Sequence, residues 1–202
     1  MIKAVFFDID GVIIESKEAN RMFLNDLFKA HGKKELSKED YLKVKFFTIR
    51  QVLEKVMPEV DFEEREKIRR EWSEKYSEYM ELIELNSGIR EILEFLKEKK
   101  FKLAVITNRT KTTVLEHFNL VEFFDFIVTA SDVEEPKPSP EGILKAIEKF
   151  QVKADEVIYI GDTIADMQAG EQAKVKMIYF QEKVKGAKNE VIESFEELKK
   201  FL

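Results

Sequence analysis

At 202 residues, the chain is long enough for one domain, or for one domain with a small second unit. Its formal net charge of −6 excludes a general attraction to nucleic acid or to an anionic membrane surface, and the lack of cysteine excludes disulfides, thiolate metal sites and a thiol nucleophile. No apolar run approaches the roughly 20 residues of a membrane helix, and no secretory leader opens the chain, so we expect a cytoplasmic protein with no nucleic-acid and no membrane partner.

The first predicted element is a buried strand over residues 3–8, which leads into two carboxylates and a glycine. Residues i and i+2 of an extended strand point the same way, so Asp8 and Asp10 are expected side by side at its carboxyl end. Carboxylates that close repel each other, and burial strengthens the repulsion. A hard divalent cation such as Mg²⁺, which takes oxygen ligands, would relieve it. Gly11 lets the chain leave the strand at angles that other residues avoid.

Residues 17–84 differ from the rest, because they are highly charged, helical in period and contain no convincing strand. One predicted helix has an apolar face made of Met22, Leu24, Leu27 and Phe28. A second helix stops at Pro58, and a long third one continues to Ile83.

From Ser87 onward, helices and strands alternate along the chain. The predicted strands are residues 102–107, 126–130, 157–160 and 177–180. The predicted helices begin with one capped by Ser87, followed by residues 112–118, residues 139–150 opening on Ser139 and Pro140, a helix after Asp162, and residues 195–202. This alternation is typical of an α/β fold with a parallel sheet covered by helices on both faces.

The helical block interrupts the α/β pattern directly after the first strand. We therefore predict an α/β core of residues 1–16 and 85–202 and an inserted helical cap domain of residues 17–84. Ligands of open parallel sheets bind at the carboxyl ends of the strands, so we expect the insert to act as a lid over that end.

Polar residues follow each of the first four core strands at this end. They are Asp8 and Asp10 after the first strand, Thr107, Asn108 and Arg109 after the second, Lys137 in the loop after the third, and Asp162 and Asp166 after the fourth. Carboxylates suit a metal ion, whereas a hydroxyl and an ammonium group suit an anion. The combination fits phosphoryl transfer, in which catalysis is mainly positioning and charge neutralisation. A carboxylate is a competent nucleophile toward phosphorus, and a second one can move protons.

Four motifs, in this order and spacing, resemble those of the haloacid-dehalogenase superfamily of phosphohydrolases. They are DIDGV from Asp8, TNR from Thr107, KPSP from Lys137 and GDTIAD from Gly161. The resemblance covers residues 1 to about 16 and about 85 to 180, and the helical insert resembles the small cap of the phosphoglycolate-phosphatase and β-phosphoglucomutase branch. It implies a Rossmann-like core, a Mg²⁺ cofactor, and a phosphatase that acts on a small phosphorylated metabolite such as phosphoglycolate or a sugar phosphate through an aspartyl-phosphate intermediate.

The resemblance also implies roles for the acidic residues. Asp8 would be the nucleophile, and Asp10 would protonate the leaving alcohol and then activate water. Asp8, the backbone carbonyl of Asp10, and Asp162 would hold Mg²⁺. Asp166 would act from beside the metal ligands, orienting Lys137 or a metal-bound water.

The remaining motif residues would bind the phosphoryl group. The Thr107 hydroxyl and the Asn108 backbone N–H would hold its oxygens, and Lys137 would neutralise Asp8 and the phosphate together. One departure from the family lies outside the site: relatives usually place a glycine after Ala173, where a helix ends, and here Lys174 stands there. We expect this to cost local stability and to leave the chemistry unchanged.

Two other functions are open on the sequence. One is a β-phosphoglucomutase-like isomerase, although the histidine that such mutases carry ten residues after the second aspartate is Asn20 here. The other is a non-catalytic phosphoacceptor module, which would not need a large cap. Arg50 is a candidate for reaching a substrate anion from the cap, but a surface ion pair is the preferred interpretation.

Overall fold

The computed structural model describes residues 1–45, 47–181 and 190–202, and the chain divides into two compact units. One unit comprises Met1–Glu15 and Leu85–Leu202, and the other comprises Ser16–Glu84. The second unit begins one residue before the helical insert that the sequence predicts.

The first unit is built on a six-stranded parallel sheet with the order β5-β4-β1-β6-β7-β8. Its strands are β1 (Ala4–Phe7), β4 (Lys102–Ile106), β5 (Phe126–Val128), β6 (Val157–Gly161), β7 (Lys176–Phe180) and β8 (Glu190–Ile192). Strand β1 lies between β4 and β6, with Phe7 opposite both Val105 and Ile160. The predicted α/β fold class is confirmed, whereas β8, which is only three residues long, was not expected from the sequence.

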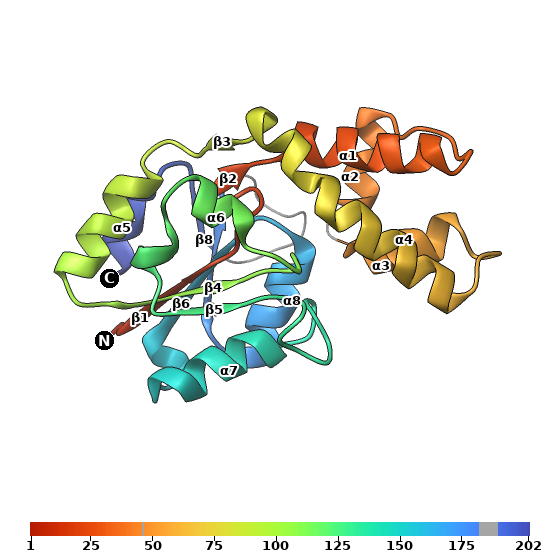
Figure 1. The fold of residues 1–202 in the computed structure, drawn as a ribbon. Helices are drawn as coiled ribbons and strands as arrows, with labels where there is room; N and C mark the ends of the chain where they lie inside the picture. Colours follow the sequence, from red (N-terminus) through yellow and green to blue (C-terminus); the bar gives the residue numbers. More distant parts are fainter. Residues whose placement is uncertain (46, 182–189) are drawn as a thin grey trace. The chain divides into compact units, whose positions relative to one another are not determined.

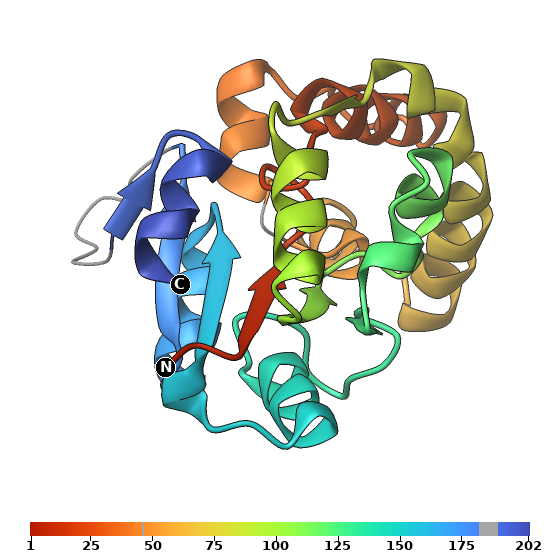
Figure 2. The ribbon, with the colours of Figure 1, turned by 90° about the vertical axis from the view of Figure 1, so that its left-hand side faces the viewer.

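Helices cover both faces of this sheet (Figure 1). The α-helices of the unit are α5 (Ile89–Glu98), α6 (Thr113–His117), α7 (Glu141–Phe150) and α8 (Ile164–Ala173), and the 3₁₀ helices are η2 (Val121–Phe123), η3 (Ala154–Glu156) and η4 (Phe195–Phe201). Ala4 and Phe6 of β1 are fully buried in one cluster with Ile143 of α7 and Ala169 of α8. Because side chains alternate along a strand, the intervening apolar residues of β1 face the opposite layer, where α5 packs on β4 and η4. The two termini lie near each other in both views (Figures 1 and 2).

Two helix starts and one helix type differ from the expected ones. Helix α5 is preceded by Gly88 in a left-handed conformation (φ 81°), and no side chain caps it, so Ser87 is not its cap. Helix α7 begins at Glu141, with Pro140 at the N-cap position, although the Ser139 hydroxyl accepts a hydrogen bond from the Glu141 N–H. The last predicted helix is the 3₁₀ helix η4.

The second unit consists of helices that pack around aromatic side chains. They are α1 (Lys17–Ala30), α2 (Lys38–Val44), α3 (Ile49–Val56), α4 (Phe62–Lys75) and the 3₁₀ helix η1 (Tyr76–Leu82). The ring of Phe23 meets those of Trp72, Tyr76 and Tyr79 edge-on, at centroid distances of 6.0, 5.2 and 5.6 Å. The predicted apolar face of α1 is wrong by one position, because Phe23 is buried there and Met22 is 38% exposed. The predicted long third helix changes to 3₁₀ geometry after Lys75.

Two short strands, β2 (Ile14–Glu15) and β3 (Glu84–Leu85), form a separate two-stranded sheet where the chain passes between the units. The Asn86 side chain, which follows β3, donates hydrogen bonds to the carbonyl oxygens of Val12 (2.8 Å) and Gly11 (3.3 Å). It thereby ties the turn after β1 to the segment that follows β3. In the described part of the chain, no helix has the length and apolar character needed to cross a membrane.

Candidate active site

Asp8 follows directly on β1, at the carboxyl end of the sheet. The four residues of β1 are apolar and fully buried, so the strand delivers the Asp8 side chain into the interior, where the residue is 6% exposed. Its N–H donates to the Ile160 carbonyl of β6 at 2.9 Å, which extends the pairing of β1 by one residue. The Lys137 ammonium lies 2.8 Å from Asp8 Oδ1. The nucleophile candidate is therefore buried and held against a cation.

Lys137 is itself buried and collects four oxygen atoms. Besides Asp8 Oδ1, its Nζ lies 2.6 Å from Asp166 Oδ1 and 3.0 Å from both the Ile106 carbonyl oxygen and the Tyr159 hydroxyl. Burial alone would lower the pKa of Lys137, but the carboxylates of Asp166 and Asp8 outweigh it and raise the pKa above its ordinary value. The side chain is thus a fixed positive charge at the base of the site.

The electrostatic surroundings of Asp8 favour a further cation. Burial raises the pKa of Asp8 well above its ordinary value, Lys137 opposes this, and the nearby carboxylates of Asp166, Asp10 and Asp162 raise it again. Only the ionised carboxylate is a nucleophile. A second positive charge beside Asp8 would favour that form.

Thr107 and Asn108 follow β4, one and two residues beyond the strand. The register Phe7–Val105 places Asp8 opposite Ile106, so the buried Thr107 lies next along the same edge. The Asn108 side chain makes two reciprocal hydrogen bonds with the main chain of Lys137, accepting from its N–H (2.9 Å) and donating to its carbonyl oxygen (3.0 Å). Sequence reasoning assigned Asn108 only a backbone contact and missed this clasp, which fixes the loop that carries Lys137.

The Asp10 carboxylate is bound by Arg109. The guanidinium donates two hydrogen bonds, from Nε to Oδ2 and from an Nη to Oδ1, both at 2.7 Å. Such a bidentate pair fixes the carboxylate in both position and plane. Sequence reasoning placed Arg109 in a motif but gave it no role; the signal was a cation in the loop that faces two aspartates. The two carboxylates after β1 are therefore each paired with a side-chain cation, Asp8 with Lys137 and Asp10 with Arg109. The sequence analysis had expected a metal ion to offset the repulsion between them.

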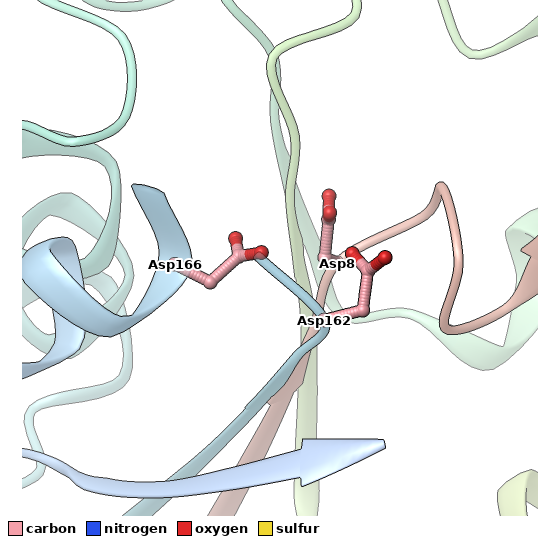
Figure 3. Close-up of side chains that lie close together, drawn as sticks. All are labelled: Asp8, Asp162 and Asp166. Carbon is pink, nitrogen blue, oxygen red and sulfur yellow. The ribbon is translucent and has the colours of Figure 1, made fainter. Parts of the chain in front are cut away.

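Asp162 and Asp166 come from the loop after β6 and from helix α8. One carboxylate oxygen from each of Asp8, Asp162 and Asp166 lies within 4.8 Å of the others, and Figure 3 shows the three side chains converging from two segments. A Cβ atom added at Gly11 would lie 2.3 Å from Asp162 Oδ2, and one at Gly161 would lie 2.4 Å from Asp166 Cβ. Two glycines are therefore required for the carboxylates to approach the backbone this closely.

Asp166 is completely buried and accepts hydrogen bonds at both oxygens. Lys137 and the Tyr159 hydroxyl bind Oδ1, each at 2.6 Å, while the Thr163 N–H and hydroxyl bind Oδ2 at 3.0 and 2.5 Å. Burial alone would raise the pKa of Asp166, but Lys137 and these hydrogen bonds outweigh it and lower the pKa. The two oxygens of Asp166 thus accept four hydrogen bonds, one of them from Lys137, which is compatible with the orienting role that the sequence analysis gave as one of two alternatives. Tyr159 was missed, and its signal was a lone hydroxyl in an otherwise aliphatic strand.

The donor set fits a hard divalent cation. Asp8 and Asp162 offer carboxylate oxygens, and Gly11, which the Asp162 carboxylate abuts, directly follows the Asp10 carbonyl. Asp166 fits less well, because its oxygens already accept hydrogen bonds from Lys137, Tyr159 and Thr163. Asp8 and Asp162, two of the three donors that the sequence predicted, therefore lie close enough together to share a metal ion.

Arg50 lies in the helical unit and is engaged there. Its guanidinium binds Glu66 through two hydrogen bonds of 2.8 and 3.0 Å. This agrees with the ion pair that the sequence analysis preferred over a substrate contact.

Comparison with known proteins gives one family. The sequence model of the haloacid dehalogenase-like hydrolases matches residues 5–180. A phosphoglycolate phosphatase of Aquifex aeolicus is 32% identical over 183 residues, covering 87% of this chain and 83% of that protein. The pyrophosphatase PpaX of Halalkalibacterium halodurans is 30% identical over 178 residues, covering 87% of this chain and 81% of that protein.

A solved structure agrees with these sequence matches. A haloacid dehalogenase-superfamily hydrolase of subfamily IA from Geobacter sulfurreducens superimposes with a TM-score of 0.76 at 31% identity, covering 100% of this chain and 96% of that chain. The resemblance found in the four motifs is confirmed, and so is the expectation of an enzyme of the phosphatase type. The chain belongs to the haloacid dehalogenase-like hydrolase family.

Proposed function

We propose that this protein is a Mg²⁺-dependent phosphomonoester hydrolase that forms an aspartyl phosphate on Asp8. The observation that carries the proposal is the 2.8 Å pair between Asp8 and Lys137, buried at the carboxyl end of the sheet with Asp162 close by. A buried ammonium beside a nucleophilic carboxylate neutralises the charge that gathers when a phosphoryl group arrives. The family membership and the phosphatase names of both curated relatives support it.

The residues divide the reaction between them. Asp8 attacks phosphorus, the bond from phosphorus to the ester oxygen breaks, and Asp10 protonates the departing alcohol. Asp10 then takes a proton from water, which attacks the phosphorus of the aspartyl phosphate and releases inorganic phosphate and free Asp8. Thr107 and the Asn108 N–H bind phosphoryl oxygens, and Lys137 stabilises them.

Asp8, Asp162 and the Asp10 carbonyl would hold Mg²⁺. When bound, the ion supplies charge neutralisation at the phosphoryl oxygens. Because Arg109 binds both oxygens of Asp10, that carboxylate has to leave or share this ion pair before it can carry a proton.

For the substrate, we propose a small phosphorylated metabolite, with phosphoglycolate and sugar phosphates first. The Aquifex relative, named a phosphoglycolate phosphatase, supports the first of these. The relative named PpaX is a pyrophosphatase, so inorganic pyrophosphate is the second candidate. The same residues could cleave a phosphoanhydride bond, with phosphate as the leaving group in place of the alcohol.

The test is turnover of p-nitrophenyl phosphate with and without Mg²⁺. We expect activity that EDTA abolishes and that Asp8→Asn lowers by roughly 10³-fold or more. Asp125→Asn is the control, because Asp125 also pairs with a lysine (Lys97, 3.2 Å) but lies outside the site. Unchanged activity in Asp8→Asn, or equal losses in both variants, would refute the proposal.

A panel of phosphoglycolate, sugar phosphates and pyrophosphate, ranked by kcat/KM, then separates the substrate classes. Conversion of β-glucose 1-phosphate to the 6-phosphate would favour the mutase instead. Stoichiometric labelling of Asp8 without turnover would favour a phosphoacceptor module.

A further inference from the structure

Tyr159 places a hydroxyl group in the middle of strand β6, whose other residues are aliphatic or glycine. The side chain is completely buried, and a buried hydroxyl is costly unless it forms hydrogen bonds. Its oxygen lies 2.6 Å from Asp166 Oδ1, 3.0 Å from Lys137 Nζ and 3.4 Å from the Ile106 carbonyl oxygen. The hydroxyl thus contacts both members of the ion pair between Lys137 and Asp166.

The available protons can be assigned among these atoms. The Lys137 ammonium has three protons and four oxygen neighbours, namely Asp8 Oδ1, Asp166 Oδ1, Ile106 O and Tyr159 Oη. The hydroxyl has one proton, and its shortest contact by far is the carboxylate of Asp166. Donation from Tyr159 to Asp166 leaves the ammonium free to bind Asp8, Ile106 and either remaining oxygen.

Two anions compete for the Lys137 ammonium. Asp166 lies nearer to it (2.6 Å) than Asp8 does (2.8 Å), and both carboxylates are buried, where electrostatic attraction is strong. A hydroxyl that donates to Asp166 disperses part of that carboxylate's charge and weakens its attraction for Lys137. We propose, on the basis of the function proposed above, that Tyr159 is a positioning residue that keeps the Lys137 ammonium on Asp8, where the phosphoryl group is received.

The substitution Tyr159→Phe removes only the hydroxyl. Asp166 then loses a donor and draws Lys137 toward itself, away from Asp8. We expect kcat for p-nitrophenyl phosphate to fall by about tenfold with KM changed by less than about threefold, because the lost interaction matters most when charge develops in the transition state.

Tyr179 provides a matched control on the neighbouring strand β7. It is also completely buried, and among the described residues its hydroxyl has no hydrogen-bond partner. Tyr179→Phe therefore makes the same chemical change in the same sheet without touching Lys137. We expect its kcat to stay within about twofold of the wild-type value.

A double-mutant cycle separates positioning from a merely structural effect. If Tyr159 acts through Lys137, then Tyr159→Phe has no further effect on kcat once Lys137 is replaced by Met. Independent, multiplicative losses in the double variant would overturn the inference.

A second readout needs neither metal nor turnover. The buried Lys137 ammonium should give a slowly exchanging ¹⁵N–¹H signal in the metal-free protein, assigned by its loss in Lys137→Met. We expect this signal to shift in Tyr159→Phe and to stay in place in Tyr179→Phe. In the wild type, a protected Tyr159 hydroxyl proton is expected as well, which tests the hydrogen bond without any substitution.

The outcomes distinguish this inference from the proposed function. A wild-type enzyme that turns over, with Tyr159→Phe equal to Tyr179→Phe in kcat, overturns the role of Tyr159 alone. A wild-type protein without metal-dependent turnover overturns the proposed function. The role of Tyr159 is then decided by whether the Lys137 ammonium signal shifts in Tyr159→Phe. If the Lys137 signal is identical in Tyr159→Phe and Tyr179→Phe, the role of Tyr159 is overturned, whether or not the wild type turns over.

Discussion

Lys174 ends helix α8 in the left-handed region of backbone conformation, with a φ of 60°. Its N–H donates hydrogen bonds to the carbonyl oxygens of Glu171 and Gly170, as is usual at the end of a helix. Because the left-handed conformation is unfavourable for residues with a Cβ atom, the backbone here suits glycine and strains lysine. The sequence predicted a local cost at this position, and the backbone provides its cause.

We therefore expect Lys174→Gly to raise the free energy of unfolding by about 0.5–1 kcal/mol, since relief of the left-handed strain exceeds the extra chain entropy of glycine. Urea unfolding monitored by circular dichroism measures this change. Glu171→Gly, inside the same helix, is the control and should lose about 1 kcal/mol. A loss of stability in both variants would contradict the strain argument.

Single residues also set the limits of sequence reasoning. That Asp8, Lys137, Asp162 and Asp166 meet could be predicted, because the carboxyl ends of parallel strands share one edge. The Arg109–Asp10 pair and the Asn108 clasp on Lys137 could not, since each joins loops distant in sequence whose conformations depend on the folded core. The assigned roles of these residues in catalysis stay predictions.

At the scale of elements, helix α8 begins with a capping box that also serves the site. The Thr163 hydroxyl accepts a hydrogen bond from the Asp166 N–H at 3.2 Å, and the Asp166 carboxylate accepts one from the Thr163 N–H at 3.0 Å. Helix α3 of the other unit begins with an equivalent box made by Thr48 and Gln51. Helices α3 and α8 thus begin with similar caps, and the cap of α8 holds a carboxylate of the candidate active site.

Thr163→Ala should lower stability by about 1–2 kcal/mol through loss of the cap, and should also reduce kcat by about tenfold, because Asp166 loses a donor that fixes its orientation. Thr48→Ala should cost similar stability in its own unit while kcat stays unchanged. Thermal unfolding and p-nitrophenyl phosphate turnover measure the two effects. Equal kcat values in both variants would separate the α8 cap from catalysis.

Helices α3 and α4 are joined by charges around Glu66, which accepts hydrogen bonds from Arg50 of α3 and Arg69 of α4. These hydrogen bonds lower the pKa of Glu66 to about 2, Arg50 contributing most. Because the pKa in the folded state is below that of the unfolded chain, the stabilisation is complete above pH 4.5 and is lost as pH falls toward 2.

Glu66→Gln should therefore lower the stability of the helical unit at pH 7 by about 1–2 kcal/mol, a value reduced for solvent screening of Arg50. Near pH 2, the variant and the wild type should be equally stable. Denaturant unfolding across this pH range, with Glu63→Gln on the exposed face of α4 as the control, checks the prediction. A difference that persists unchanged at pH 2 would rule out the ionic origin.

At the scale of the whole molecule, the division into two units predicts that the first unit can fold without the second. The six strands of the main sheet, and all the predicted site residues except the candidate Arg50, belong to the unit of Met1–Glu15 and Leu85–Leu202. Strands β2 and β3 bring the ends of the insertion together by pairing with each other. Replacing residues 16–84 by a short Gly-Ser linker should leave a folded core that unfolds cooperatively.

The protected Lys137 ammonium signal is the measurement that reports whether the site survives in this shortened protein. Its loss, together with loss of cooperative unfolding, would show that the core needs the helical unit. Turnover by the same variant measures what the helical unit adds to the reaction, which tests the expected role of the insert as a lid.

Strand β1 is synthesised long before either of the two strands that flank it in the sheet. Its partners β4 and β6 begin with Lys102 and Val157, opposite Ala4, so one neighbour is synthesised roughly a hundred residues later and the other about fifty residues after that. During translation, the apolar segment Ala4–Phe7 therefore remains without either of the strands that enclose it in the folded protein, and an unpaired apolar strand favours aggregation or chaperone binding. The strand that carries Asp8 at its end therefore exposes the nascent chain to aggregation until β4 and β6 have been synthesised.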